Sequence, residues 1–146
     1  MLDLVIRGGQ VVTPEGVGTW DVGVEGERIV AIGAPGTLPR ESARAVDASG
    51  KLVIPGGIDP HVHTGWPIPA LGGGVTLSGG PGQVSRAAIF GGTTTIGDFA
   101  VWEPGMSIAE AITKKQEVWR EGCTDYALHV MLQGAVPPDV IDQIPE

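Results

Sequence analysis

The residues best suited to chemistry in this chain are two histidines separated by one residue, His61 and His63. They follow an apolar run, residues 51–54, that we expect to be a buried strand, and a Gly56-Gly57 turn. In an extended chain, residues two apart point to the same face, so both imidazoles can reach one ion. Neutral imidazole binds zinc and neighbouring divalent metals. We therefore predict a metal site here; the alternatives are a solvated strand end or a hydrogen-bonded pair.

Three other side chains could serve such a site or simply support the fold. Asp59 and Asp98 could each orient a ligand imidazole or cap a turn. His129 could be a third ligand, but because it lies inside a predicted strand we expect it to pack in the core or to support a ligand by hydrogen bonding. The single cysteine, Cys123, cannot form an internal disulfide, which fits a reducing cytoplasm. We interpret this cysteine as structural or incidental.

The composition describes a folded chain with many turns. Of its 146 residues, 42% are apolar and only 18% are charged, while 24 are glycine and 12 are proline. The formal net charge of -8 argues against electrostatic binding to nucleic acid or acidic membranes. The amino terminus lacks the pattern of a signal peptide, and no segment approaches the ~20 apolar residues of a membrane span. These features predict a soluble, cytoplasmic protein without a membrane partner.

The amino-terminal third of the chain is expected to form short β-strands. The apolar pattern predicts strands at residues 2–7 and 10–13, separated by a turn or bulge at Gly8-Gly9. Residues 21–25 and 28–32 read as a hairpin, and residues 45–48 as a further short strand. Such a sheet is too small to be a satisfactory domain alone.

From residue 53 the pattern changes to alternating strands and helices. The expected elements are a strand ending before the histidine pair, a flexible glycine-rich loop over 64–82, a helix over 83–90, a strand over 93–99, a helix opened by a Ser107–Glu110 capping box, a strand over 125–132 and a helix over 137–144. This order predicts an α/β fold with a parallel sheet. A (β/α)8 barrel needs about 250 residues, so at most three of its eight units fit here. An open doubly wound sheet is the alternative.

Three segments together resemble a known family. Residues 53–63 with the histidine pair, residues 90–96 and Asp98-Phe99 are similar to the amidohydrolase superfamily, and within it to the hydantoinase and dihydropyrimidinase branch of cyclic amidohydrolases. The resemblance implies the amino-terminal portion of a metal-dependent (β/α)8 TIM barrel. Residues 1–52 would then be the amino-terminal part of a small β-sandwich, and residues 53–146 the first three βα units of the barrel.

The resemblance also implies a cofactor and a reaction. Two divalent metals, zinc or else manganese or another ion, would share a carbamylated lysine and a hydroxide, with His61 and His63 on the more buried metal. The hydroxide would attack the carbonyl of a small cyclic amide, such as a hydantoin or a dihydropyrimidine, and an aspartate would move the proton to the leaving nitrogen. Members of the family are commonly homo-oligomers, in particular tetramers.

No catalytic residue of this scheme is expected within the chain. Lys51 precedes the first barrel strand, and Lys114 and Lys115 are expected to lie exposed in the middle of a helix. None is placed to bridge metals, so the carbamylated lysine and the general-base aspartate are expected downstream. The 146-residue chain alone is therefore predicted to be inactive.

Three questions stay open at the level of sequence. Trp66 could form an apolar wall for a ring substituent of the substrate, or it could anchor its loop in the core. A non-catalytic relative that keeps the barrel as an assembly scaffold is one alternative function. A single-metal deaminase of the same superfamily, which also begins with a histidine pair, is another.

Overall fold

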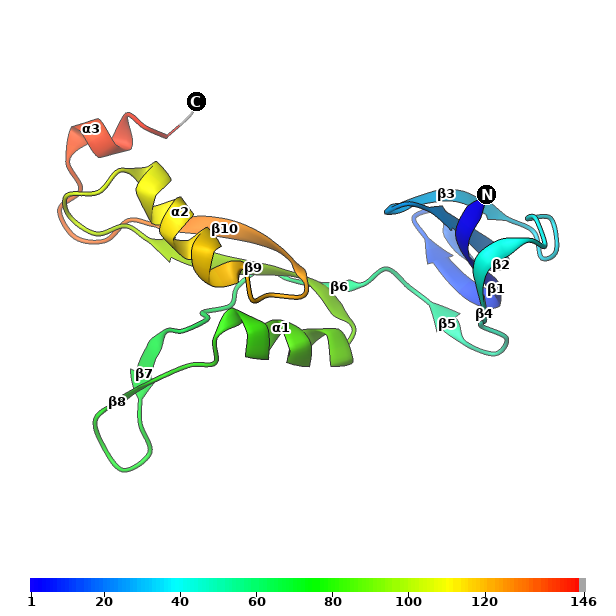
Figure 1. The fold of residues 1–146 in the computed structure, drawn as a ribbon, viewed down its shortest axis with the longest axis horizontal. Coiled ribbons are helices and arrows are strands. Elements are labelled where there is room, and N and C mark those ends of the chain that lie inside the picture. The colour runs from blue at the N-terminus through cyan, green and yellow to red at the C-terminus, as the bar shows by residue number, and fades with distance from the viewer. Residues whose placement is uncertain (145–146) are drawn as a thin grey trace. The chain divides into compact units, whose positions relative to one another are not determined.

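The computed structural model describes residues 1–144, which form two compact units, Met1–Pro55 and a second unit that begins at Gly56 (Figure 1). The first unit is a sheet in the order β3-β2-β1-β4, with β5 also paired to β1. Its strands are β1 (Leu2–Thr13), β2 (Gly16–Glu25), β3 (Arg28–Gly33), β4 (Ser42–Asp47) and β5 (Leu52–Val53). The hairpin β2–β3 is antiparallel with Glu25 opposite Arg28, as predicted.

A bulge in β1 is held by a buried carboxylate. The register between β1 and β2 shifts between Ile6 and Gly9, and Gly8 has a φ of +68°, which glycine adopts without strain. Asp21 is 1% exposed and accepts hydrogen bonds from the amides of Gly8 and Gly36, each at 2.9 Å. The Gly36 amide bond outweighs the opposing effect of burial, and together with the other donors it lowers the pKa of Asp21.

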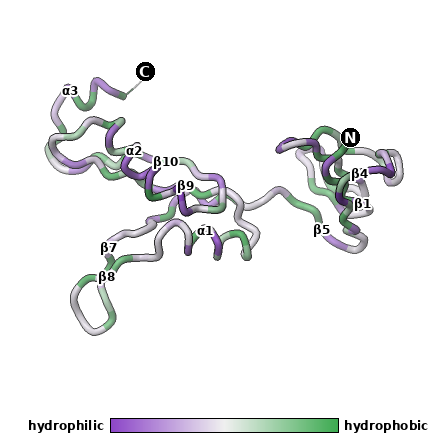
Figure 2. Tube along the Cα trace, viewed as in Figure 1, coloured by the Kyte–Doolittle hydropathy of each residue, from purple (hydrophilic) through white to green (hydrophobic). Residues whose placement is uncertain are grey.

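The apolar run at residues 51–54 does not form the buried strand that we expected before the histidines. Leu52 and Val53 instead form β5, which pairs in parallel with Gln10 and Val11 of β1 in the first unit. Leu52 and Ile54 are 59% and 62% exposed, and Figure 2 shows this hydrophobic stretch along β5. The strand that leads to the histidines is β6 (Gly57–Asp59), which has three residues and follows the Pro55-Gly56 step.

The second unit is built on a parallel sheet in the order β10-β9-β6. Its other elements are the strands β7 (Pro67–Pro69), β8 (Val75–Leu77), β9 (Thr93–Val101) and β10 (Asp125–Met131), and the helices α1 (Pro81–Phe90), α2 (Ile108–Trp119) and α3 (Pro138–Ile141). The predicted α/β class is therefore confirmed for this part of the chain. The glycine-rich loop at 64–82 was expected to lack structure, but it contains an antiparallel hairpin, β7–β8.

Helix α2 is set against the sheet by its cap and its apolar face. Ser107 accepts a hydrogen bond from the Glu110 amide while the Glu110 side chain accepts one from the Ser107 amide, which is the predicted capping box. Ala111 and Trp119 are buried at 2% exposure each.

Across residues 1–144, no helix is long and apolar enough to cross a membrane.

Candidate metal centre

The two predicted ligands converge just beyond the carboxyl end of β6. The Nε2 atoms of His61 and His63 lie 3.2 Å apart, and their rings meet edge to face with centroids 5.0 Å apart. Two imidazoles on one tetrahedral zinc, with Zn–N bonds of 2.0–2.1 Å, place their nitrogens about 3.3–3.4 Å apart. The geometry therefore fits a shared ion, and it also fits a direct hydrogen bond between the rings. The Nδ1 atom of His63 is buried, with no hydrogen-bond partner in the described part of the chain.

A cluster of aromatic rings surrounds the histidine pair. Phe99, near the carboxyl end of β9, packs against His61 and His63 with centroid distances of 4.7 and 4.6 Å. Trp66 packs against His63 at 4.5 Å and is half-buried. These contacts restrict the rotation of both imidazoles, so the side chains are held in place from two elements.

His129 supports the segment from the neighbouring strand rather than packing in the core. It is exposed on β10, its ring lies 5.0 Å from that of Phe99, and its Nε2 is hydrogen-bonded to the carbonyl oxygen of Pro60 at 3.0 Å. The imidazole thus contacts the residue that precedes His61. Of our two expectations for His129, core packing is wrong, and the observed bond fits the supporting role.

A glycine lets the histidine segment approach β9 closely. A Cβ atom on Gly97 would lie 2.5 Å from the Pro60 carbonyl oxygen and 2.8 Å from its carbon, distances that real Cβ atoms essentially never show. The Gly97 carbonyl accepts a hydrogen bond from the Val62 amide at 2.8 Å. Gly97 therefore fixes the backbone on both sides of His61.

Asp98 anchors Thr64, the residue after the histidine pair. Its side chain is fully buried and accepts hydrogen bonds from the Thr64 amide at 3.2 Å, the Thr64 hydroxyl and Trp119 Nε1 at 2.8 Å. Burial alone would raise the pKa of Asp98. The hydrogen bonds from Thr64 and Trp119, together with those from the Lys115 ammonium and the Phe99 amide, outweigh the effect of burial and lower the pKa. Asp59 has the simpler role, since its carboxylate accepts from the His61 amide at 3.2 Å.

The expectation that Lys115 is exposed is wrong. Its side chain is 14% exposed and its Nζ lies 2.9 Å from Asp98 Oδ2, whereas Lys114 is 61% exposed and pairs with Glu103. Lys115 lies four residues after Ala111 and four before Trp119, so it shares the buried face of α2. That spacing was visible in the sequence and would have indicated its burial.

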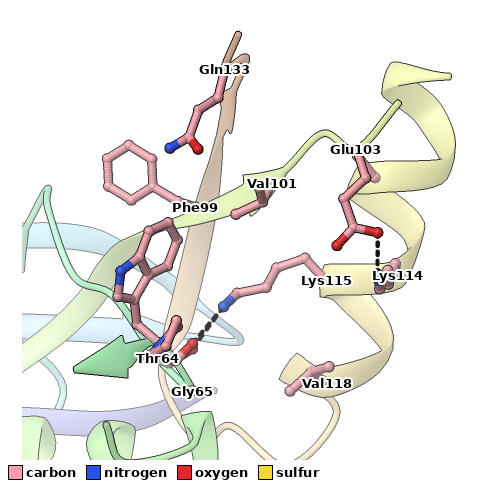
Figure 3. A pocket seen from close by; sticks show the side chains of 12 residues that line it. Thr64, Gly65, Phe99, Val101, Glu103, Lys114, Lys115, Val118 and Gln133 are labelled. Carbon is pink, nitrogen blue, oxygen red and sulfur yellow. Dashed lines mark hydrogen bonds and ion pairs between the residues drawn. The ribbon is translucent and has the colours of Figure 1, made fainter. Parts of the chain in front are cut away.

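A pocket of about 410 Å³ opens beside the aromatic cluster, and Figure 3 shows the side chains around it. Its lining residues are Thr64, Gly65, Trp66, Pro67, Phe99, Val101, Glu103, Ala111, Lys114, Lys115, Val118 and Gln133. Trp66 and Phe99 contact both this space and His63, so the pocket adjoins the histidine pair. The walls are mostly apolar, with a charged pair, Lys114 and Glu103, at the edge.

Within residues 1–144, no cluster of three or more histidine, cysteine, aspartate or glutamate side chains could hold a metal. The described chain thus offers two converging imidazoles and no complete coordination shell. Cys123 is exposed, and its amide donates to the buried Ser85 hydroxyl at 3.0 Å.

Comparison with known sequences shows which proteins the chain is similar to. No family model matches the chain. The chain is 39% identical over 132 residues to the D-hydantoinase of Streptomyces coelicolor, covering 88% of this chain and 27% of that protein. It is 40% identical over 135 residues to the dihydropyrimidinase of Rattus norvegicus, covering 87% and 24%. The chain is a homologue of the hydantoinases and dihydropyrimidinases. The predicted resemblance is thereby confirmed.

Solved structures of such enzymes share the fold of this hydantoinase homologue. The dihydropyrimidinase from Brevibacillus agri superimposes with a TM-score of 0.79 at 37% identity, covering 94% of this chain and 29% of that one. A D-hydantoinase from Bacillus sp. AR9 gives a TM-score of 0.80 at 41% identity, covering 96% and 29%. The chain spans about a quarter of the length of the curated relatives it matches.

Proposed function

We propose that this chain contributes the first two metal ligands of a cyclic amidohydrolase, an enzyme that hydrolyses a ring C–N bond in a hydantoin, a dihydropyrimidine or a similar cyclic amide. The observation that carries the proposal is the convergence of His61 Nε2 and His63 Nε2 at 3.2 Å, at the carboxyl end of a parallel strand. Active sites of parallel α/β folds lie at that end of the strands. The homology to hydantoinases and dihydropyrimidinases supports the substrate class.

The histidines would hold a divalent metal, zinc or manganese, through their Nε2 atoms. A bound metal would supply Lewis-acid chemistry, which makes water a better nucleophile and polarises an amide carbonyl. The residues of this chain keep the two imidazoles in place: Phe99 and Trp66 by packing, and Gly97 and Asp98 through the backbone around them. The remaining ligands, a carbamylated lysine and a proton-shuttling aspartate belong to the part of the enzyme after residue 146 in this proposal.

The pocket beside His63 would receive the ring substituent of the substrate. Its apolar walls include Trp66, Phe99 and Val118, which favour an aliphatic or aromatic group over a charged one. We expect Trp66→Ala to raise KM for an aryl-substituted hydantoin more than for unsubstituted hydantoin. Equal changes for both substrates would assign Trp66 to loop anchoring alone.

The test of the function uses the full-length protein that contains this chain. Metal content and hydrolysis of hydantoin and dihydrouracil are measured for the wild type and for His61→Asn, His63→Asn and His129→Asn. Replacing residues that merely support a ligand typically costs about 10–100-fold in metal affinity, so loss of a ligand should cost at least about 100-fold. The His129→Asn variant should keep its metal stoichiometry, since its ring binds a backbone carbonyl. Wild-type metal content in the His61 and His63 variants would refute the proposal.

A further inference from the structure

Two adjacent lysines on α2 have different surroundings. Lys114 is 61% exposed and pairs with the exposed Glu103 at 3.1 Å, an arrangement that contributes little to stability. Lys115 is 14% exposed and pairs with Asp98, whose carboxylate is 0% exposed. Figure 3 shows the Lys115 side chain extending from the helix to Thr64. The two residues form a natural pair for comparison, because they share a helix and a side-chain type.

The ammonium of Lys115 uses all of its hydrogen-bonding capacity. An ammonium has three donors, and Lys115 Nζ has three acceptors: the Thr64 carbonyl at 2.9 Å, the Thr64 hydroxyl at 3.0 Å and Asp98 Oδ2 at 2.9 Å. No donor is left for a substrate in the pocket. Lys115 is therefore not placed to bind a ligand. Two of its three contacts are to Thr64, the residue after His63, and the third is to Asp98, which itself binds Thr64.

Thr64 is held at every polar atom. Its amide and hydroxyl donate to Asp98, and its carbonyl accepts from Lys115. On the other side, the Ser78 hydroxyl donates to the His63 carbonyl at 2.6 Å and accepts from the Trp66 amide at 2.8 Å. The backbone from His63 to Trp66 is thus fixed by partners from outside the segment.

A buried ion pair is a costly way to obtain stability alone. Replacing such a pair by well-packed apolar residues is often neutral or stabilising, whereas a fully satisfied polar network favours one geometry. On the basis of the metal site proposed above, we propose that Lys115 is a positioning residue. Through Asp98 and Thr64 it fixes the orientation of the His63 imidazole, and it thereby raises the affinity of the site for its metal.

The experiment measures Zn²⁺ affinity by chelator competition in the full-length protein, together with the visible spectrum of the Co²⁺-substituted form. Lys115→Met removes the ammonium and Lys114→Met is the matched control. We expect Zn²⁺ affinity to fall about 10–100-fold in Lys115→Met, with a changed Co²⁺ spectrum. The Lys114→Met variant should match the wild type in both measurements. A folded Lys115→Met variant with wild-type affinity and spectrum would overturn the inference.

A second pair of variants covers the case in which Lys115→Met does not fold. Thr64→Val removes only the hydroxyl and keeps the ion pair, and Thr64→Ser restores the hydroxyl. We expect weaker Zn²⁺ binding in Thr64→Val and recovery in Thr64→Ser; wild-type binding in Thr64→Val would overturn the inference. A wild-type protein that binds no Zn²⁺ would instead refute the metal site itself, so the two failures are distinguishable.

Discussion

Gly97→Ala is the substitution whose effect follows most directly from the structure. The new methyl group would lie 2.5 Å from the Pro60 carbonyl oxygen, whereas ordinary van der Waals contact begins at 3.4 Å. Since both partners are backbone, relief requires a movement of about 0.9 Å in the segment that leads to His61. The bonds from Val62 to Gly97 and from His129 to Pro60 would stretch with it.

Two effects of different size should result. Overpacking of this kind typically costs about 1–3 kcal/mol in the free energy of unfolding. Functional side chains tolerate displacements of only about 0.5 Å, and a misplacement of about 1 Å can cost about 100-fold in rate. We therefore expect a moderately destabilised protein whose metal affinity falls by at least about tenfold.

The assay combines urea unfolding followed by circular dichroism with Zn²⁺ competition on the full-length protein. Gly91→Ala is the control, because its Cβ would meet the Ala88 carbonyl at 3.4 Å, an ordinary contact, and its φ is −86°. Stability and Zn²⁺ affinity in Gly97→Ala equal to those of Gly91→Ala would refute the reasoning, since the Pro60 backbone would then be free to shift without consequence.

Three further substitutions test the hydrogen bonds of Asp98, the bulge in β1 and the amino-terminal cap of α2. Trp119→Phe removes the indole donor to Asp98 and should lower the free energy of unfolding by about 1–3 kcal/mol in urea titration, with no loss if the bond is dispensable. In the wild type, the lowered pKa of Asp21 adds stability that is complete above about pH 4 and is lost as the pH falls through the pKa of the folded state. The Asp21→Asn variant lacks this carboxylate, so its melting temperature should decrease less steeply in acid than that of the wild type. An unchanged acid slope would contradict this role. Ser107→Ala should cost about 1 kcal/mol, measured by urea unfolding, and an unaffected midpoint would argue that the capping box is redundant.

The parts of the fold that sequence predicted well are those with local signals. The hairpin at β2–β3, the strand β9 and the start of α2 each carry a turn, a β-branched run or a capping box within a few residues. The histidine pair was found in the same way, because its two residues are only two positions apart in the sequence. Local chemistry was sufficient in these cases.

The errors concern contacts between distant segments. Residues 51–54 are apolar enough for a core strand, yet Leu52 and Val53 pair with β1, and no local feature distinguishes the two sheets. The burial of Lys115 could have been inferred from its spacing in α2, but its partner Thr64 is 51 residues away and could not. The roles of Trp66, the tetrameric assembly and the cytoplasmic location stay predictions.

The pairing of β1 has a consequence for the order in which the first unit can fold. Its contacts with β2 close a short hairpin, so they can form as soon as residue 25 is available. The contacts of Gln10 and Val11 with Leu52 and Val53 span most of the unit, and such non-local pairings form late. The first half of β1 can pair earlier with β4, but during synthesis Gln10 and Val11 must wait for a strand that lies only four residues before the start of β6. Completion of the first sheet and emergence of the histidine segment from the ribosome should be nearly simultaneous.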